Sequence, residues 1–220
     1  MKRRATKASG PRLCGPLLAL IALPFSGCQL AEPSDPTEFY VLASPSAAST
    51  AAAPGEPLAA IVGIERVRLP GYLSRSDFVV RDAGARVRLQ SFQRWAEPLE
   101  QSLTRGLRQG LDAELPWARV IDEPWRRSIA SDYTVRFDIE QFEPDLAEGV
   151  VLMRALVYVR AREAGEIIAI REIAHREPIG ARASAASADR VPGNEAALAM
   201  SRCLPVLTTA AAEALNTHRR

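Results

Sequence analysis

A repeat of leucines marks the clearest predicted helix of this chain. Leucines recur every four residues, at Leu99, Leu103, Leu107, Leu111 and Leu115, so they lie along one stripe of an α-helix while charged residues such as Arg108 fall outside it. The pattern predicts an amphipathic helix from about Trp95 to Leu115. Pro98 fits only in its first turn. Gly106 and Gly110, on the apolar side, predict a close approach to a neighbouring element.

A period of two residues predicts strands elsewhere. Between Tyr133 and Glu140, apolar and polar residues alternate as in a half-exposed strand. Short apolar runs predict further strands, at residues 39–43, 58–69, 78–81, 87–90, 117–122, 150–162 and 167–177. Asp82–Ala85 and Glu163–Glu166 predict hairpin turns, with Gly84 at a position that needs a positive φ.

The order of these elements predicts the fold class. A second helix is expected from about Asn194 to Leu215, and Pro205 must kink or break it. Runs of strands joined by short turns, with two well-separated helices, favour an α+β fold rather than βαβ winding. We therefore predict a single domain in which two main helices pack on a largely antiparallel sheet, with Ala- and Ser-rich loops at 44–57 and 181–190.

The N-terminus has the features of an export signal. Five basic residues and no acidic residue precede an apolar run, Leu13–Phe25. Pro16 and Pro24 interrupt this run, and it is too short for a membrane-spanning helix. Ser26 and Gly27 place two small residues before Cys28, the pattern of a bacterial lipobox, although Phe25 stands where an aliphatic residue is usual. The alternative is an ordinary secretory signal followed by an ordinary thiol.

The lipobox predicts the organisation of the chain. We expect a signal peptide at 1–27, cleavage between Gly27 and Cys28, a covalent lipid on Cys28, a tether at 28–37 rich in Pro, Ser and acidic residues, and a domain at 38–220. With the signal removed, 23 basic and 26 acidic residues remain of the original 28 and 26, because residues 1–27 hold five basic and no acidic residues. The net charge falls from +2 to −3, which disfavours nucleic acid as a partner.

The sequence offers little catalytic chemistry. It contains no Gly-rich phosphate loop, no HExxH, no CxxC and no Gly-x-Ser-x-Gly, and His175 and His218 are too isolated to suggest a metal site or a triad. A two-carboxylate hydrolase could use residues from the group Asp138, Glu140, Glu143 and Asp145, but charges on the wet face of a sheet are commoner. We predict no enzyme activity, no metal and no cofactor besides the lipid on Cys28.

One turn is a candidate for a protein contact. Leu69-Pro70-Gly71-Tyr72-Leu73 gathers apolar residues at a Pro-Gly turn, where such residues either cap the core or wait for a partner. We expect Leu69, Pro70, Tyr72 and Leu73 to contribute to an interface, with an exposed Tyr72 as the anchor between two leucines.

Four blocks that follow the lipobox carry a resemblance to a known family. They are Phe39-Tyr40-Val41-Leu42, the segment Ile61–Leu73, Phe78-Val79-Val80-Arg81 and Arg94-Trp95-Ala96-Glu97-Pro98-Leu99. In this order they resemble the PqiC-like family, also described as the auxiliary lipoprotein component of ABC-type transport systems. The resemblance covers nearly the whole mature chain and is densest from residue 61 to residue 115.

This resemblance implies a function without catalysis. It implies a periplasmic accessory subunit of an MCE-type intermembrane lipid transport system that supports envelope integrity. Such a subunit is lipid-anchored at the periplasmic face of the outer membrane and works beside an MCE-domain protein and an associated membrane-spanning protein, as a monomer or as a homo-oligomer. Gln29 suits that placement, because it is not the Asp that commonly retains lipoproteins at the inner membrane. A periplasmic assembly or cell-wall regulator lipoprotein is the alternative, and a lipoprotein hydrolase would need a nucleophile and base that the sequence does not display.

Overall fold

The computed structural model describes residues 35–43, 59–123, 130–162, 165–180 and 193–219. By its internal contacts the chain divides into residues 1–35 and residues 36–220, and the fold concerns the second unit. Gly27, Cys28 and the predicted signal peptide lie outside the described residues, as do most of the tether and the predicted loops at 44–57 and 181–190. The division into signal, tether and domain therefore stays a prediction.

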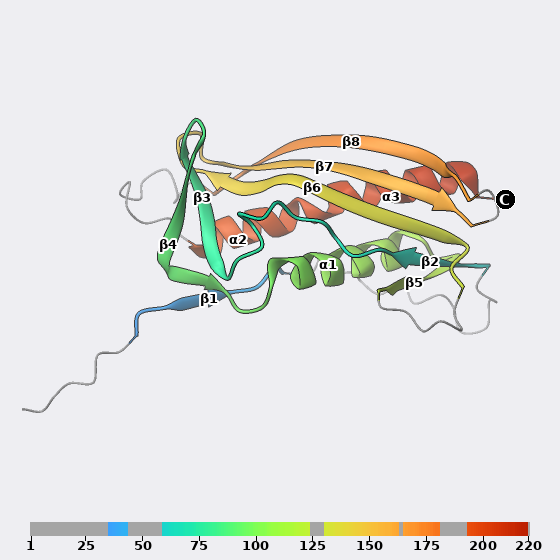
Figure 1. Cartoon of the computed structure of the whole chain (residues 1–220), viewed down its shortest axis with the longest axis horizontal. Helices are drawn as coiled ribbons and strands as arrows, with labels where there is room; N and C mark the ends of the chain where they lie inside the picture. Colours follow the sequence, from blue (N-terminus) through green and yellow to red (C-terminus); the bar gives the residue numbers. More distant parts are fainter. Residues whose placement is uncertain (1–34, 44–58, 124–129, 163–164, 181–192, 220) are drawn as a thin grey trace, which may run out of the picture. The chain divides into compact units, whose positions relative to one another are not determined.

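Three long antiparallel strands form one side of the sheet, with β8 at the edge. β6 (Tyr133–Asp145) pairs with β7 (Val150–Ala161), and β7 pairs with β8 (Ile167–Pro178). Alternate residues of β6 and β7 point into the core, so that Val135 and Val157 are fully buried. The helices cover this apolar face (Figure 1). The period of two seen in the sequence is thereby confirmed as the pattern of strands with one buried face.

Five shorter strands extend the sheet from the other edge of β6, in two groups (Figure 1). Near the start of β6, β2 (Ala60–Ile64) pairs in parallel with β6 and with β5 (Ala118–Asp122). Near its end, β3 (Asp77–Ala83) pairs in parallel with β6 and antiparallel with β4 (Arg86–Trp95). β4 in turn pairs in parallel with β1 (Glu38–Tyr40).

The prediction of a largely antiparallel sheet is therefore wrong. The domain combines helices with a sheet, as the α+β class requires, but β1–β4, β2–β5, β2–β6 and β3–β6 are parallel pairs. Short turns in a sequence reveal only hairpins, which join antiparallel neighbours. Parallel neighbours need a long crossover, and here the β3–β4 hairpin and a helix lie between β2 and β5 along the chain.

The leucine repeat forms helix α1 (Leu99–Glu114). All five leucines of the stripe are at most 2% exposed, so the predicted apolar face is confirmed. The predicted start at Trp95 is wrong, because Trp95 ends β4 and Pro98 is the N-cap residue with an extended ψ of 129°. A proline disfavours the helical conformation in the residue before it, so the chain stays extended until Pro98.

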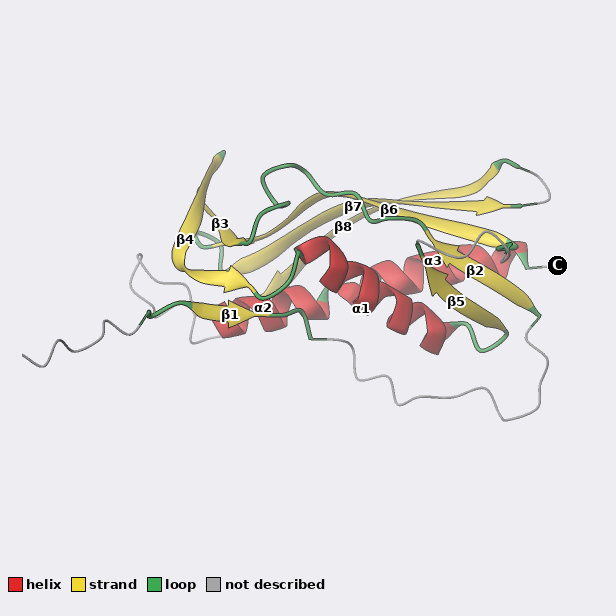
Figure 2. Ribbon diagram, turned by 60° about the horizontal axis from the view of Figure 1, so that its bottom comes forward, coloured by secondary structure: helices red, strands yellow, loops and turns green. Residues whose placement is uncertain are grey.

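The C-terminal helix is broken where the sequence predicted a kink or break. α2 (Gly193–Arg202) and α3 (Leu204–His218) are separate segments, and Pro205 stands in the first turn of α3. The two main helices expected from the sequence are thus three helical segments among the described residues. α3 lies beside α1 (Figure 2) and also packs on β7 and β8.

Glycines allow α1 and α3 to approach closely. A Cβ atom placed on Gly110 would lie 2.7 Å from Cγ2 of Thr208, and one placed on Gly106 would lie 2.3 Å from Cδ2 of Leu204. Both distances are shorter than real side chains allow. The predicted close approach on the apolar side of α1 is confirmed, and α3 is the neighbour.

The predicted hairpin of β3 and β4 is also present, and Gly84 adopts a φ of 56° in its turn. β4 runs past the predicted end at Gln90 as far as Trp95. Its pairing with β3 shifts on the way, because Phe78 pairs with Gln90 while Asp77 pairs with Arg94. This bulge interrupts the alternation of apolar and polar residues after Gln90, which explains why the pattern predicted an end at Gln90 although the strand continues to Trp95.

Candidate functional site

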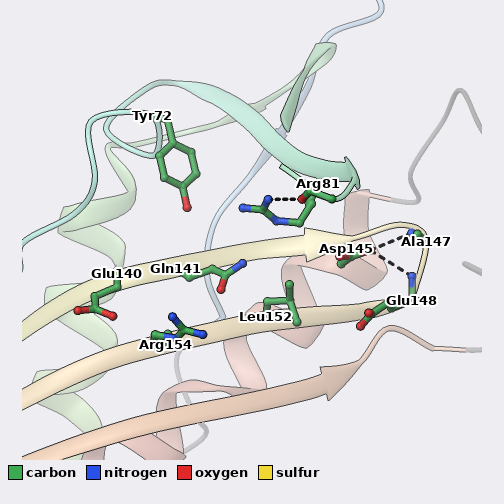
Figure 3. A pocket seen from close by; sticks show the side chains of 10 residues that line it. Tyr72, Arg81, Glu140, Gln141, Asp145, Ala147, Glu148, Leu152 and Arg154 are labelled. Carbon is green, nitrogen blue, oxygen red and sulfur yellow. Dashed lines mark hydrogen bonds between the residues drawn. The ribbon is translucent and has the colours of Figure 1, made fainter. Parts of the chain in front are cut away.

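The turn at Leu69–Leu73 packs onto the outer face of the sheet, the face opposite the helices (Figure 3). The carbonyl of Pro70 accepts a hydrogen bond from the backbone N–H of Leu73 at 2.9 Å, which closes the turn. Leu69 and Pro70 are partly buried, and Leu73 is a core residue with 2% exposure. Gly71 is the exposed residue of the turn.

The expectation of an exposed Tyr72 is therefore wrong, and Leu73 follows the alternative in which an apolar residue of the turn caps the core. Tyr72 is half-buried, and its hydroxyl donates a hydrogen bond to Oε2 of Glu143 at 2.9 Å. The sequence could not show this contact, since Glu143 lies on a strand far along the chain. The turn is held to the domain by Tyr72 and Leu73, and the surface that it offers to a partner consists of Gly71 and the rim made by Leu69 and Pro70.

A fully buried carboxylate lies beneath the turn. Glu143 on β6 is 0% exposed, and its Oε1 accepts hydrogen bonds from Nη2 of Arg81 at 2.6 Å, Nε of Arg81 at 3.0 Å and Nε2 of Gln141 at 3.0 Å. Its Oε2 accepts from Tyr72 and from the backbone N–H of Phe142 at 3.0 Å. Every side of this carboxylate has a donor, as a buried charge requires.

Both Tyr72 and Arg81 have a raised pKa beside Glu143. Burial, followed by the hydrogen bond and the negative charge of Glu143, raises the pKa of Tyr72 above its ordinary value, so its hydroxyl stays protonated and remains a donor. The hydrogen bond to Glu143 raises the pKa of Arg81 as well. Arg81 and Glu143 thus form a charge pair that is almost completely buried. The Arg81 side chain is 18% exposed and the Glu143 side chain is 0% exposed.

A β-bulge in β6 explains why Glu143 points to the outer face. Ile139 pairs with Ala155 of β7 and Gln141 pairs with Arg154, so Glu140 is an extra residue. The alternation changes phase at that point, and Phe142 enters the core at 1% exposure while Glu143 turns outward. β3 and the Leu69–Leu73 turn then cover Glu143 from one side, because Arg81 of β3 pairs with Asp145.

An open cavity adjoins this cluster (Figure 3). Its volume is about 620 Å³, and its lining combines Tyr72, Arg81, Gln141, Leu152 and Arg154 with the turn between β6 and β7. In that turn, Oδ1 of Asp145 accepts hydrogen bonds from the backbone N–H groups of Ala147 at 3.0 Å and Glu148 at 3.1 Å. The cavity is therefore lined by side chains of both charges, positive at Arg81 and Arg154 and negative at Asp145 and Glu148.

The four carboxylates considered as hydrolase candidates do not form one group. Asp138 lies within ion-pair distance of Arg136 and Arg68, at 3.3 and 3.8 Å, and Glu140 is exposed at the bulge. The expectation that these charges lie on a wet face is wrong for Glu143 and Asp145, which are 0% and 7% exposed. Both are occupied by hydrogen bonds that stabilise the local fold.

The described parts of the chain hold no group of three or more His, Cys, Asp and Glu side chains placed to bind a metal ion. His175 lies on β8 beside Glu177, at 3.2 Å, whereas Nδ1 of His218 lies 2.9 Å from the carbonyl oxygen of Ala214 on α3. Within the same ranges, no helix is at once long enough and apolar enough to cross a bilayer.

Sequence reasoning missed the pair of Arg81 and Glu143. One signal was available in the sequence. Phe137 and Ile139 follow a period of two, but the next large apolar residue, Phe142, comes three positions after Ile139 instead of two. Such a break of phase inside a strand indicates a bulge. It could have placed Phe142 in the core and Glu143 on the opposite face, although not the arginine and tyrosine that cover it.

Comparison with known proteins gives a family and a fold. The family model described as "ABC-type transport auxiliary lipoprotein component" matches residues 40–200. A crystal structure of an uncharacterized protein is similar with a TM-score of 0.63 and 17% identity, covering 80% of this chain and 97% of that one. Protein XCC0632 from Xanthomonas campestris is similar with a TM-score of 0.58 and 15% identity, covering 80% and 93%. At these identities the two structures support the fold alone. No curated protein matches the chain significantly.

Proposed function

Because the chain belongs to the family of ABC-type transport auxiliary lipoprotein components, we propose that it is a non-enzymatic accessory subunit of an MCE-type intermembrane lipid transport system. The observation that carries this proposal is the family match over residues 40–200, which runs from β1 into α2. In this role the protein supports envelope integrity from the periplasmic face of the outer membrane. Its partners are an MCE-domain protein and the associated membrane-spanning protein.

Capture of the partner tests this function. The full chain with a C-terminal tag, expressed in its own host and purified after mild cross-linking, is expected to enrich an MCE-domain protein, identified by mass spectrometry. A tagged, unrelated outer-membrane lipoprotein from the same cells is the control. Equal recovery of the MCE-domain protein with both baits would contradict the proposed system.

The proposed anchor is the lipid on Cys28. Cys28→Ala is expected to abolish metabolic lipid labelling. It should also move the protein into the soluble fraction when the membranes are washed with about 0.5 M salt, because burial of the acyl chains in the bilayer supplies the attachment that survives such a wash. Cys203→Ala is the matched control, since Cys203 is buried in the domain and has no access to lipid-transferring enzymes. A Cys28→Ala protein that stays as firmly in the membrane fraction as the parent would refute the anchor.

The Leu69–Leu73 turn is the proposed partner interface. Replacing Tyr72 and Leu73 by serine would not test this interface cleanly. It would remove a core side chain and a hydrogen bond, so a loss of binding would have two explanations. Gly71 offers a cleaner position, since it is exposed and a Cβ atom there meets nothing within 4 Å.

We expect Gly71→Glu to leave the free energy of unfolding within about 0.5 kcal/mol of the parent. The same change should lower capture of the MCE-domain protein at least about tenfold, because it places a charge inside a desolvated contact. Gly180→Glu is the control, because Gly180 is also exposed with open space at its Cβ position. If the two variants capture the partner equally well, the interface lies elsewhere.

A further inference from the structure

Most of the large apolar side chains that are exposed in the described residues lie on or beside two paired strands, β1 and β4. Phe39 and Val41, in and just after β1, are 64% and 52% exposed, and Val87, Leu89 and Phe92 of β4 are 38%, 44% and 54% exposed. We call these five residues the β1–β4 surface. The two strands lie side by side in parallel, with Phe39 opposite Arg94, and β4 bends as it comes alongside β1 (Figure 2).

The exposure of Phe92 follows from the bulge in β4. The register between β3 and β4 passes from Phe78–Gln90 directly to Asp77–Arg94, so residues 91–93 form the bulge, and Gln93 pairs with Glu38 of β1 instead. Within the bulge, Gln93 is turned inward at 4% exposure while Phe92 is turned outward. A domain that buries the glutamine and leaves the aromatic ring in water does not use the ring for its own core, and clustered exposed apolar residues mark interaction sites.

Basic residues outnumber acidic ones on these two strands. They hold three arginines, Arg86, Arg88 and Arg94, and one acidic residue, Glu38, whereas the mature chain carries a net charge of −3 when the 23 basic and 26 acidic residues after position 27 are counted. Two aspartates of β3 lie within ion-pair distance of these arginines, Asp82 beside Arg86 and Arg88 and Asp77 beside Arg94. The side chains of Arg75, Arg86 and Arg94 are 52%, 71% and 48% exposed. Arginines beside aromatic and aliphatic side chains suit a surface that is apolar within and negatively charged at its boundary, as an anionic bilayer is.

The proposed lipid anchor lies close to β1 along the chain. Glu38, the first residue of β1, follows Cys28 by ten residues, and a stretch of that length spans at most about 35 Å. A lipid on Cys28 would therefore hold the start of β1 within that distance of the bilayer, which would raise the effective concentration of the β1–β4 surface at the membrane.

We propose that the β1–β4 surface docks on a phospholipid membrane with anionic headgroups. The rings of Phe39 and Phe92 enter the headgroup region, and the arginines of β4 contact the lipid phosphates. The domain then rests against the membrane instead of standing free on its tether. This inference rests on the proposed function, because it is the lipid anchor on Cys28 that keeps the surface near the bilayer.

Flotation with vesicles tests the docking without the lipid anchor. The mature chain from residue 28 with Cys28→Ala is mixed with vesicles of phosphatidylethanolamine and phosphatidylglycerol, and separately with phosphatidylcholine vesicles. We expect it to float with the anionic vesicles, to float less with phosphatidylcholine, and to be released when the salt concentration is raised to about 0.5 M. Phe39→Ser combined with Phe92→Ser should lower the partition coefficient at least about tenfold.

The matched control combines Ile167→Ser with Ile170→Ser. These residues are 43% and 52% exposed on β8, a strand that pairs with β7 and not with β1 or β4. The control should bind vesicles within about twofold of the parent, and circular dichroism checks that every variant is folded. Absence of flotation by the parent, or equal flotation of the two double variants, would overturn the proposal. So would a loss of self-association in the phenylalanine variant with vesicle binding unchanged, which would make the surface a contact between copies.

The two possible failures are distinguishable. The vesicle experiment contains no lipidated cysteine, so its outcome does not depend on whether Cys28 carries lipid. Fractionation of the Cys28→Ala protein in cells tests the anchor, and capture of an MCE-domain protein tests the transport role.

Discussion

Glu143→Ala is expected to lower the free energy of unfolding by about 3–5 kcal/mol, the usual cost of removing one partner of a buried ion pair. Arg81 would lose the acceptor of its Nε and Nη2 hydrogen bonds while 82% of its side chain stays covered, given its 18% exposure. Tyr72 and Gln141 would lose their acceptor as well. A urea titration followed by circular dichroism measures the change.

Three further variants make this test specific. Glu140→Ala, at the exposed bulge residue, should change stability by about 0.5 kcal/mol or less. Tyr72→Phe removes one hydrogen bond to a charged group and should cost about 1.5–3 kcal/mol. Glu143→Leu together with Arg81→Met should recover most of the loss, because apolar replacement of a buried pair is often nearly neutral. Equal effects of Glu143→Ala and Glu140→Ala would show that the cluster does not stabilise the domain.

Leu103→Asp is expected to cost about 4 kcal/mol or more, and at 25 °C it should leave little folded protein. Leu103 is 0% exposed in the middle of the α1 stripe. An aspartate there would lose the apolar contacts of the leucine and would bury a charge without a partner. The midpoint of thermal unfolding and the solubility of the variant report this effect.

Arg108→Gln is the matched control on the same helix. Arg108 lies within 3.8 Å of Asp112 and 3.7 Å of Asp122, and all three side chains are about a third exposed or more. Exposed ion pairs contribute little, so the change should stay within about 0.5 kcal/mol. If the two substitutions destabilise the domain equally, the assignment of the buried face of α1 is wrong.

Patterns in the sequence correctly predicted those features that depend on residues close together along the chain. The leucine stripe of α1 is buried, Pro205 marks the start of a separate helix, and Gly84 has the positive φ that its hairpin needs. Each of these depends on interactions within a few positions along the chain. Errors arose at Trp95 and Gln90, where a proline and a bulge moved the ends of elements by several residues.

The candidate site shows the same limit. The sequence pointed to the Leu69–Leu73 turn, but it presented Tyr72 as exposed. In the structure, Tyr72 and Arg81 both contact Glu143, and the three residues lie on three separate segments. The residue pattern within any one of these segments cannot predict such contacts. The exposure of Phe92 on β4 likewise follows from a bulge against β3 rather than from its own neighbours in the sequence.

The sequence by itself determined which segments form helices and strands, the family resemblance, and the lipobox at Cys28 on which the proposed anchor depends. Only the tertiary structure decided that the sheet is mixed, that Glu143 is buried beneath Tyr72 with Arg81 as its partner, and that the β1–β4 surface is left uncovered. The physical reason is range. Hydrophobic periodicity and turn residues act over a few positions, whereas the pairing of distant strands is decided by the packing of the whole domain against the entropy of closing long loops.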